Sequence, residues 1–292
     1  MDAAARRIDA STRLCAVIGN PVEHSLSPCM HNAAYEATGL NYVYVAFRVE
    51  DVAACLAGMK ALAGFRGMSV TIPHKLAVMP QLDEIEPLAR HVGSVNTITN
   101  ENGRLIGSTT DGPGTLRAFE EAGVSLAGRR VLFLGTGGAV RAVAFAVAQA
   151  FPEVRMTILG RTGAHVAQLV DDLLQKGGAN ASGGDLDGDL ESAMAEHDVI
   201  VQGTPVGMHP HPGDSPVPRE WLRPEQVVFD MVYRPRRTRL IREAEAAGCR
   251  VVLGIEMLIN QAVLQFERWT GVPAPVSAMR DAVLAELARE EG

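Results

Sequence analysis

The sequence predicts an α/β protein of two domains, and three observations support this. Hydrophobic runs short enough for buried strands alternate with longer segments of helical period. A length of 292 residues suits about two domains of ordinary size. A glycine-rich turn at residues 135–138 separates a hydrophobic run from an alanine-rich helical segment, which is typical of a doubly wound sheet.

The first half of the chain shows a succession of short elements. A buried strand at 14–18 ends in the turn Gly19-Asn20-Pro21, and a helix follows from about Pro28, with Ser27 as its N-cap. The remaining predicted elements are strands at 42–47 and 67–72, a helix at 51–63, and a hairpin formed by 95–99 and 104–107.

The second half repeats the strand and helix alternation more regularly. Residues 177–189 are rich in glycine and aspartate, and we expect them to form a surface loop. The predicted domains are a substrate-binding α/β domain at 1–110, a Rossmann-like domain at 111–255 and C-terminal helices at 256–292 that return to the first domain, with a cleft between the two. The elements expected here are helices at 113–122 and 164–174, a long alanine-rich helix that follows the glycine turn and ends at Ala150, strands at 130–134, 155–159, 199–202, 227–230 and 250–253, and a helical tail from about 256.

Composition excludes several classes of function. The net charge is −7, which argues against a general surface for nucleic acid or anionic membranes. No run of about 18 apolar residues could span a membrane, and the N-terminus lacks the apolar core of a signal peptide. The four cysteines have no metal-binding spacing. We therefore expect a cytoplasmic protein without a metal, present as a monomer or homodimer, that acts on a small molecule.

The glycine turn carries the first functional signal. Gly135, Gly137 and Gly138 lie between a predicted strand and helix, where backbone N–H groups can approach a pyrophosphate. The third position of this fingerprint, usually glycine or alanine, is Val140. The competing interpretation is a helix start without a ligand, but the order of strand, turn and helix favours a dinucleotide site.

The end of the next strand bears on the choice of cofactor. An enzyme that uses NAD generally places an acidic residue here to bind the ribose 2′-hydroxyl, whereas this chain has Arg161 and Thr162. A guanidinium can bind a 2′-phosphate through charge-assisted hydrogen bonds. The sequence therefore favours NADP, with NAD as the alternative and a solvated loop charge as the non-functional interpretation of Arg161.

Short polar motifs follow several predicted strands, where open α/β sheets bind ligands. Each motif alone is ambiguous, because such residues also form caps and turns. The motifs are SLSP at 25–28, SVTIPHK at 69–75, VNT at 95–97, TDG at 110–112, GTGGA at 135–139 and MLINQ at 257–261. Together and in this order they resemble the shikimate dehydrogenase family, including its quinate/shikimate branch, over residues 13 to 272.

The resemblance implies a role for each matching position. It implies that Lys75 and Asp111 form the catalytic pair, with Asp111 also in contact with the substrate. It implies a substrate site in which Ser25, Ser27 and Tyr233 lie near a carboxylate and Thr71, Asn96 and Gln261 bind ring hydroxyls. It implies a cofactor site made of Gly135, Thr136, Gly137, Gly138, Ala139, Arg161 and Thr162, with Thr204, Met231 and Gly254 on the nicotinamide side.

The chemistry of the catalytic pair agrees with a ketone reduction. An ammonium beside a carbonyl polarises it and can supply a proton to the developing alkoxide. A neighbouring carboxylate orients the amine, and the two groups titrate as a coupled pair. The expected reaction is the NADPH-dependent, reversible reduction of 3-dehydroshikimate to shikimate in aromatic amino-acid biosynthesis. The alternatives are a quinate or quinate/shikimate dehydrogenase with NAD or mixed cofactor use, and a non-catalytic NADP or shikimate sensor.

The chain departs from the family pattern at several positions. The family usually has asparagine at four places where this sequence has Ser69, Thr109, Gly160 and Gln202. His165 also occupies a place where a second basic residue often supports the 2′-phosphate. The loss of one good hydrogen bond is worth about 1–3 kcal/mol, which is roughly 5- to 150-fold in binding. These departures bear on substrate and cofactor preference more than on the reaction class.

Overall fold

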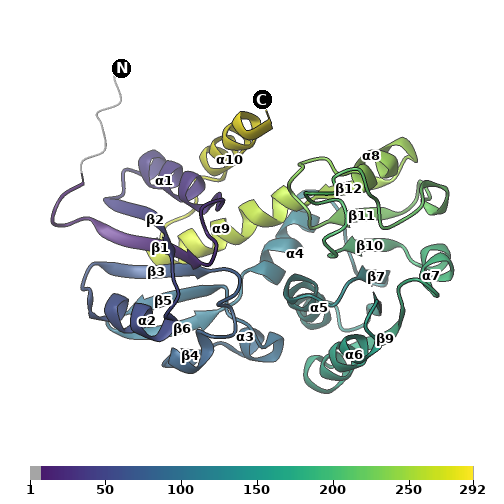
Figure 1. Ribbon diagram of the computed structural model, residues 1–292, viewed down its shortest axis with the longest axis horizontal. Coiled ribbons are helices and arrows are strands. Elements are labelled where there is room, and N and C mark those ends of the chain that lie inside the picture. Colours follow the sequence, from purple (N-terminus) through teal and green to yellow (C-terminus); the bar gives the residue numbers. More distant parts are fainter. Residues whose placement is uncertain (1–7, 292) are drawn as a thin grey trace. The chain divides into compact units, whose positions relative to one another are not determined.

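The chain folds into two compact units, each built on its own sheet (Figure 1). This is a computed structural model, and it describes residues 8–291. Unit 1 comprises Met1–Thr110 and Gln261–Gly292, and unit 2 comprises Asp111–Asn260. The predicted α/β class is confirmed.

Unit 1 contains a mixed six-stranded sheet with the strand order β2-β1-β3-β5-β6-β4. β1 pairs in parallel with β2 and β3, whereas β5 runs antiparallel to both β3 and β6. The strands are β1 (Arg13–Gly19), β2 (Tyr42–Arg48), β3 (Phe65–Val70), β4 (Glu84–Ile85), β5 (Thr97–Glu101) and β6 (Arg104–Ser108). The helices are α1 (Ser27–Thr38), α2 (Val52–Ala61), α3 (Pro87–Val92), the C-terminal part of α9 (Gly254–Thr270) and α10 (Val276–Glu291).

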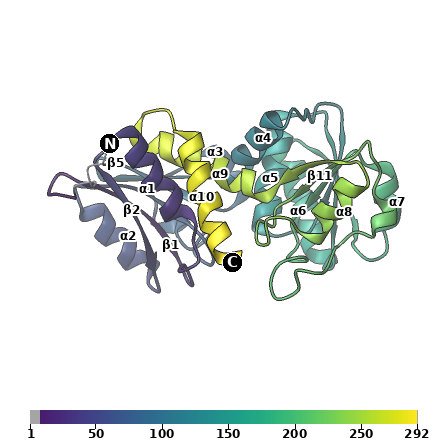
Figure 2. The same ribbon diagram turned by 90° about the horizontal axis from the view of Figure 1, so that it is seen from above.

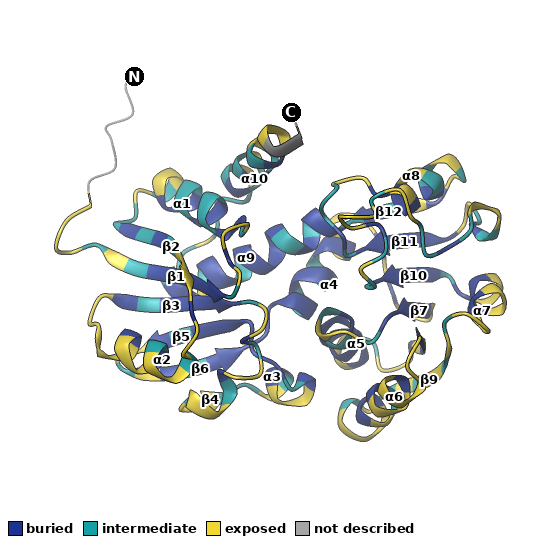
Figure 3. Cartoon of the chain, in the orientation of Figure 1, coloured by how far each residue is buried: buried dark blue, intermediate teal, exposed yellow. Residues whose placement is uncertain are grey.

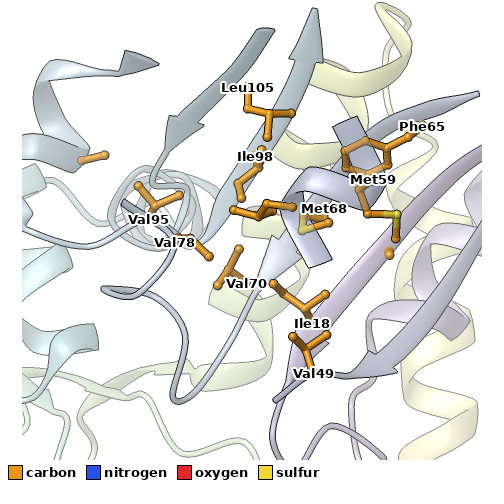
Figure 4. Packing of buried hydrophobic residues seen from close by; sticks show 13 residues of the cluster. Ile18, Val49, Met59, Phe65, Met68, Val70, Val78, Val95, Ile98 and Leu105 are labelled. Atoms are coloured by element: carbon orange, nitrogen blue, oxygen red, sulfur yellow. The ribbon is translucent and has the colours of Figure 1, made fainter. Parts of the chain in front are cut away.

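The alternation of side chains along a strand gives this sheet two different faces. Ile18, Met68 and Val70 point into one apolar cluster with Leu56 and Met59 of α2 (Figure 4). The residues between them on the same strands face the other side, where α9 packs. Figure 2 shows α1 beside α10 in this unit, and the two helices are in contact.

The face toward α9 is aromatic and partly polar. Trp269 of α9 is 2% exposed, and its indole N–H donates to the carbonyl oxygen of Ile98 at 3.0 Å. Gly67 permits this approach, since a Cβ there would lie 2.1 Å from the indole nitrogen. Tyr44 and Ser69 also lie on this face, and their hydroxyl groups are hydrogen-bonded to each other at 2.7 Å.

Unit 2 contains a parallel six-stranded sheet in the order β12-β11-β10-β7-β8-β9. The chain begins in the middle at β7, extends to one edge through β8 and β9, and then crosses to β10. This is the doubly wound topology, which binds ligands where the strand order reverses, between β7 and β10. The strands are β7 (Arg130–Leu134), β8 (Arg155–Gly160), β9 (Asn180–Asp185), β10 (Val199–Gln202), β11 (Val227–Asp230) and β12 (Arg250–Leu253). The helices are α4 (Asp111–Glu121), α5 (Gly138–Ala150), α6 (Gly163–Gly177), α7 (Leu190–Glu196) and α8 (Arg239–Ala246), followed by the start of α9.

Burial follows this architecture in both units. Figure 3 shows buried residues along the strands and in α9, while α2 and α6 carry exposed outer faces. Within residues 8–291, no helix is long and apolar enough to cross a membrane.

Two expectations about local structure are wrong. Residues 177–189 are not simply a loop, because β9 pairs with β8 in parallel. The glycines of β9 reflect close packing, since a Cβ at Gly183 would lie 2.5 Å from Val166 of α6. Ser27 is not the N-cap of α1 but its first residue. Leu26 occupies the cap position without a side-chain hydrogen bond, and the Ser25 hydroxyl accepts the Ser27 N–H at 3.3 Å.

We predict opposite effects on stability for two glycine substitutions in unit 1. Gly67→Ala should destabilise the protein by about 1–3 kcal/mol, because the new methyl group displaces the buried Trp269 indole. Gly58→Ala is the matched control. Gly58 lies inside α2 with nothing among the described residues within 4 Å of a Cβ, so alanine should stabilise by about 0.5–1 kcal/mol. Urea unfolding measures both, and a neutral Gly67→Ala variant would contradict the packing described here.

Candidate active site

Thr71 is placed at the carboxyl end of β3, close to the end of the neighbouring strand β1. Its backbone N–H donates to the carbonyl oxygen of Ile18 at 2.9 Å. A Cβ at Gly19 would lie only 2.5 Å from the Thr71 methyl group, so glycine is needed where β1 ends. The half-buried Thr71 is therefore fixed at the edge of the sheet where β1 and β3 both finish.

Lys75 lies in the turn that follows β3, and this turn is tied to the chain that enters β5. The Lys75 carbonyl oxygen accepts the N–H of Val95 at 2.9 Å, and the Asn96 carbonyl oxygen accepts the N–H of Val70 at 2.8 Å. Because β5 runs antiparallel to β3, its first residues meet the last residues of β3. Thr71, Lys75 and Asn96 consequently share one edge of the sheet.

Asn96 is buried, with 3% exposure, and its side chain fixes the residue that precedes Asp111. Its Oδ1 accepts the backbone N–H of Thr110 at 2.8 Å and the hydroxyl of Thr97 at 2.8 Å. Its Nδ2 donates to the Thr110 hydroxyl oxygen at 3.1 Å. Thr110 closes unit 1, and Asp111 follows as the first, buried residue of α4.

Three other predicted substrate residues belong to unit 1. Ser25, which is half-buried, and Ser27, which is buried, lie between β1 and the start of α1. Gln261 is buried on α9 and begins the returning segment of the unit. Tyr233 and Asp111 belong to unit 2.

A buried polar cluster behind this edge was not predicted. The Tyr44 hydroxyl donates to Ser69 at 2.7 Å, and the Ser69 hydroxyl donates to Oε1 of Gln265 at 2.8 Å. The Gln265 side chain then donates to Thr97 at 2.9 Å. The only signal in the sequence is that Gln265 follows Gln261 by four residues, which puts both on one face of a helix.

The aromatic residues around this cluster are uncharged. His31 stacks on Tyr44 with ring centroids 4.4 Å apart, and its imidazole also lies close to the side chain of Gln265. Burial lowers the pKa of His31 to about 3 and raises the pKa of Tyr44 well above its usual value. The side of the cluster away from the sheet edge is thus neutral at physiological pH.

In unit 2, the turn between β7 and α5 has the geometry that a pyrophosphate requires. Gly135 adopts a φ of 104°, which favours glycine. Gly137 precedes α5 as its N-cap, and no described side chain caps the helix. Nothing among the described residues lies within 4 Å of a Cβ at Gly137 or Gly138. The first N–H groups of α5 can therefore bind an anionic group, and the turn fits a dinucleotide.

Two neighbours explain unusual residues around this turn. Val140 occupies the third fingerprint position because Gly203, after β10, has no side chain, and a Cβ there would lie 2.3 Å from Val140. A Cβ at Gly160 would lie 3.0 Å from the methyl group of Thr136 and 2.9 Å from Val166. Gly160 is therefore required by the side chains packed around the end of β8.

Arg161 and Thr162 follow β8 and are exposed. Arg161 and Thr204 help to line a cavity of about 580 Å³ in unit 2, together with Arg239 of α8 and the acidic residues Asp187 and Asp214. Arg239 is ion-paired with Glu243, which leaves Arg161 as the candidate to bind a phosphate group. Arg161 follows the second strand of a doubly wound sheet, the place where the ribose of a dinucleotide binds.

Thr204 and Met231, which are predicted on the nicotinamide side, are each held in place by a neighbouring residue. The Gln202 side chain accepts the Thr204 N–H at 3.0 Å and donates to its carbonyl oxygen at 3.1 Å. Met231 is held close to Gly254, since a Cβ on that glycine would lie 2.6 Å from the Met231 carbonyl oxygen. The loops that carry Thr204 and Met231 are therefore rigidly attached to the ends of β10, β11 and β12.

Asp230, at the end of β11, anchors the loop that carries Met231 and Tyr233. Its carboxylate accepts the Val232 N–H at 3.0 Å and the Thr238 hydroxyl at 2.6 Å. Burial raises the pKa of Asp230 to about 6, and the two hydrogen bonds only partly oppose this. Asp230 was not predicted, and its position at a strand end was the available signal.

The predicted residues thus gather at two edges, one in each unit. Unit 1 brings together Thr71, Lys75 and Asn96, with Ser25 and Ser27 after β1 and Gln261 on α9. Unit 2 holds the cofactor turn at 135–139, Arg161, Thr162, Thr204, Met231 and Gly254. The residues that the structure describes contain no cluster of histidine, cysteine or acidic residues able to hold a metal ion.

Comparisons with known proteins give a consistent result. Residues 17–98 match the family model described as the shikimate dehydrogenase substrate binding domain, and residues 254–284 match the shikimate 5'-dehydrogenase C-terminal domain. A shikimate dehydrogenase (NADP(+)) of Moorella thermoacetica is 46% identical over 96% of this chain and 95% of its own length.

Solved structures agree with these matches. The shikimate 5-dehydrogenase of Listeria monocytogenes, in complex with shikimate and NAD, has a TM-score of 0.90 at 36% identity and covers 94% of this chain and 97% of its own. The quinate dehydrogenase of Corynebacterium glutamicum, in complex with NAD, has a TM-score of 0.88 at 32% identity and covers 94% of this chain and 99% of its own.

We predict that Asp230→Asn removes a pH dependence of stability. The folded-state pKa is raised to about 6 from 3.8, so the folded protein binds this proton more tightly than the unfolded chain. The wild type therefore loses stability as pH rises between those two values, whereas the amide does not titrate. Relative to wild type, the variant should gain up to about 3 kcal/mol between pH 4 and pH 7.

Urea unfolding across that pH range measures this difference. Asp171→Asn, an exposed change on α6, supplies the baseline for loss of one carboxylate. Parallel pH profiles for wild type and Asp230→Asn would show that folding does not raise the pKa of Asp230.

Proposed function

The chain belongs to the shikimate dehydrogenase family, and we propose that it catalyses the NADPH-dependent, reversible reduction of 3-dehydroshikimate to shikimate. In this role it serves aromatic amino-acid biosynthesis in the cytoplasm, as a monomer or homodimer without a nucleic-acid partner. The observation that carries the proposal is that each unit has one of the two features the reaction needs. In unit 1, Thr71, Lys75 and Asn96 gather at one edge of the sheet. In unit 2, an open glycine turn precedes the uncapped helix α5.

We propose that one predicted domain binds the substrate and the other binds the cofactor. The substrate domain, residues 1–110 with the C-terminal helices 256–292, would bind the ring acid. Support comes from the match of residues 17–98 to a substrate binding domain. The Rossmann-like domain, residues 111–255, would bind the cofactor, and its strand order with the reversal between β7 and β10 supports this.

The residues of unit 2 fit a dinucleotide phosphate. The N–H groups at Gly137, Gly138 and Ala139 would bind the pyrophosphate, and Arg161 with Thr162 would bind the ribose 2′-phosphate. Gly135 and Thr136 shape the turn, while Thr204, Met231 and Gly254 would position the nicotinamide. When bound, the reduced cofactor supplies the hydride for the ketone.

The proton and the substrate contacts come from the other predicted residues. The Nζ of Lys75 would donate a proton to the carbonyl oxygen as it becomes an alkoxide, with Asp111 as the carboxylate partner that orients the ammonium. Thr71, Asn96 and Gln261 would bind ring hydroxyls. Ser25, Ser27 and Tyr233 would bind the carboxylate.

A quinate dehydrogenase with NAD or mixed cofactor use is the second candidate. The likeness to the Corynebacterium glutamicum quinate dehydrogenase in complex with NAD favours it, as does Ser69 in place of the usual asparagine. A non-catalytic sensor is less well supported, because a sensor requires no proton donor and the chain retains both Lys75 and Asp111.

Four parallel assays distinguish these functions, with shikimate or quinate as substrate and NADP⁺ or NAD⁺ as cofactor. We expect the highest kcat/KM for shikimate with NADP⁺, measured from the absorbance of the reduced nicotinamide. A higher kcat/KM for quinate with NAD⁺ would assign the chain to the second candidate. Binding without turnover in all four assays would indicate the sensor.

Lys75→Ala is the control that attributes turnover to this site. Loss of a general acid typically lowers turnover by about 10²–10⁴-fold, while the substrate contacts of the other residues remain. Shikimate binding to the variant, followed by calorimetry, should therefore persist. Near-normal turnover would remove Lys75 from the mechanism.

We predict that Arg161 determines the preference between the two cofactors. Arg161→Ala should raise KM for NADP⁺ by roughly 10- to 150-fold, because charge-assisted hydrogen bonds to the 2′-phosphate are lost. KM for NAD⁺ should stay within about threefold, since NAD lacks that phosphate. Arg155→Ala, at the opposite end of the same strand β8, is the matched control. An equal rise in KM for both cofactors would show that Arg161 does not recognise the phosphate.

A further inference from the structure

Helix α9 presents two glutamines one turn apart in unit 1. Gln261 is one of the predicted substrate residues, whereas Gln265 is completely buried and has no role in the proposed function above. The helix is fixed in register by Trp269, whose indole donates to Ile98 and fills the space left by Gly67. Gln265 therefore has a fixed position against β3 and β5.

The orientation of the Gln265 amide follows from its neighbours. One end lies 3.4 Å from the carbonyl oxygen of Asn96, which can only accept a hydrogen bond, so that end is the NH₂ group. The same NH₂ group donates to the Thr97 hydroxyl oxygen at 2.9 Å. The other end, Oε1, faces Ser69 at 2.8 Å, so Ser69 donates and in turn accepts from Tyr44.

This orientation determines which atom of Asn96 can serve a ligand. Since the Thr97 hydroxyl accepts from Gln265, its own proton is directed to Oδ1 of Asn96 at 2.8 Å. The Thr110 N–H donates to the same Oδ1 at 2.8 Å. The Thr110 hydroxyl also lies 3.3 Å from this oxygen, so donors of the protein itself occupy its lone pairs. Any hydrogen bond from the Asn96 side chain to a ligand is consequently donated by Nδ2.

The groups packed directly against Gln265 are uncharged, while the charged residues Lys75 and Asp111 belong to the segments bonded to Val95 and Thr110. The groups that face Gln265 from α1 and β2 are the neutral His31 imidazole and the Tyr44 phenol, while β3 and β5 contribute hydroxyl groups. A buried amide whose NH₂ and carbonyl ends are both bonded is costly to rotate, because rotation would leave donors and acceptors unpaired.

We propose that Gln265 is a positioning residue that, acting through Thr97 and together with the backbone N–H of Thr110, holds Asn96 as a hydrogen-bond donor and thereby selects substrates with an acceptor hydroxyl oxygen at the ring position facing Asn96. The substrate class is a cyclic polyhydroxy acid. This inference rests on the proposed function, because it assumes that Asn96 contacts the substrate ring. It extends that function by giving Gln265, through Thr97 and Ser69, a part in specificity.

Two substitutions separate the parts of this network. Gln265→Leu removes both the donor to Thr97 and the acceptor for Ser69. Gln265→Glu keeps an acceptor for Ser69 but has no NH₂ group for Thr97 and Asn96. If the donor end matters, both variants should raise KM for shikimate by roughly 5- to 150-fold, with a smaller change in kcat, because one well-oriented hydrogen bond is lost.

Gln226→Leu is the matched control for burial of a glutamine. Gln226 in unit 2 is also completely buried, and its NH₂ group donates to the carbonyl oxygens of Met194 and His197. It should lose stability as Gln265→Leu does, but it should leave KM for shikimate unchanged. KM for NADP⁺ should stay within about twofold in both Gln265 variants, since Gln265 lies in unit 1.

The decisive measurement compares shikimate with analogues that each lack one ring hydroxyl. For one analogue, wild type and Gln265→Leu should bind with the same affinity, because the hydroxyl that Asn96 recognises is absent. Calorimetry gives these affinities whether or not turnover occurs. Equal losses of affinity for shikimate and every analogue would overturn the inference, as would an unchanged shikimate affinity in folded Gln265→Leu, which has no hydrogen-bonding group at this position.

These outcomes are separable from failure of the proposed function. If wild type binds no shikimate, the proposed function and this inference are both wrong. If wild type binds and reduces the expected substrate while the Gln265 variants behave as Gln226→Leu does, only the inference is wrong. Should Gln265→Leu not fold, Gln265→Glu and the unbranched Gln265→Met provide the same comparison.

Discussion

The hydrogen bonds of Asn96 are the interaction on which the candidate substrate site depends. Through its backbone, this residue joins the end of β3 to the start of β5, and through its side chain it fixes Thr110. Thr110 is the last residue of unit 1, and the predicted catalytic residue Asp111 follows it directly. Buried polar groups that are hydrogen-bonded are costly to rearrange, so Asn96 provides a rigid reference for the residues around it.

Rigidity in unit 2 has a different origin. Glycine residues at the strand ends allow neighbouring side chains to pack closely against the backbone. Gly203 leaves space for Val140, and Gly160 leaves space for Thr136. The β7 and α5 turn is thereby held against the ends of β8 and β10 while its helix terminus stays open. Unit 1 thus fixes hydrogen-bonding side chains for a polar ring, and unit 2 fixes backbone N–H groups for phosphates.

The sequence predicted the regular elements well because burial imposes a clear period on them. β7, β8 and the helix α5 occur where the hydrophobic pattern and the glycine turn indicated. It failed at β9, where glycines required for packing against Val166 were interpreted as turn residues. A glycine in such a segment can indicate either a turn or a strand residue packed closely against a helix. Only the position of the neighbouring helix distinguishes these two possibilities.

The same limit applies to the site. Residues in short motifs, such as Thr71 and Lys75, could be placed from the sequence because they follow strands. Tyr44, Ser69 and Gln265 could not be joined from the sequence, because they come from β2, β3 and α9 and meet only through tertiary packing. Asp230 was missed for a related reason: its partner Thr238 is contributed by the start of α8.

At the four positions where the family usually has asparagine, the effect of the replacement depends on the tertiary neighbours of the residue. Ser69 is short, and the amide of Gln265 occupies the space beside it. Gln202 uses its extra length to bond the Thr204 backbone, while Gly160 accommodates Thr136. Nothing in the structure explains Thr109, whose buried hydroxyl has no hydrogen-bond partner among the described residues. At three of the four, the substituted residue and its neighbour form a matched pair, so a change at one position is expected to have an effect that depends on the other.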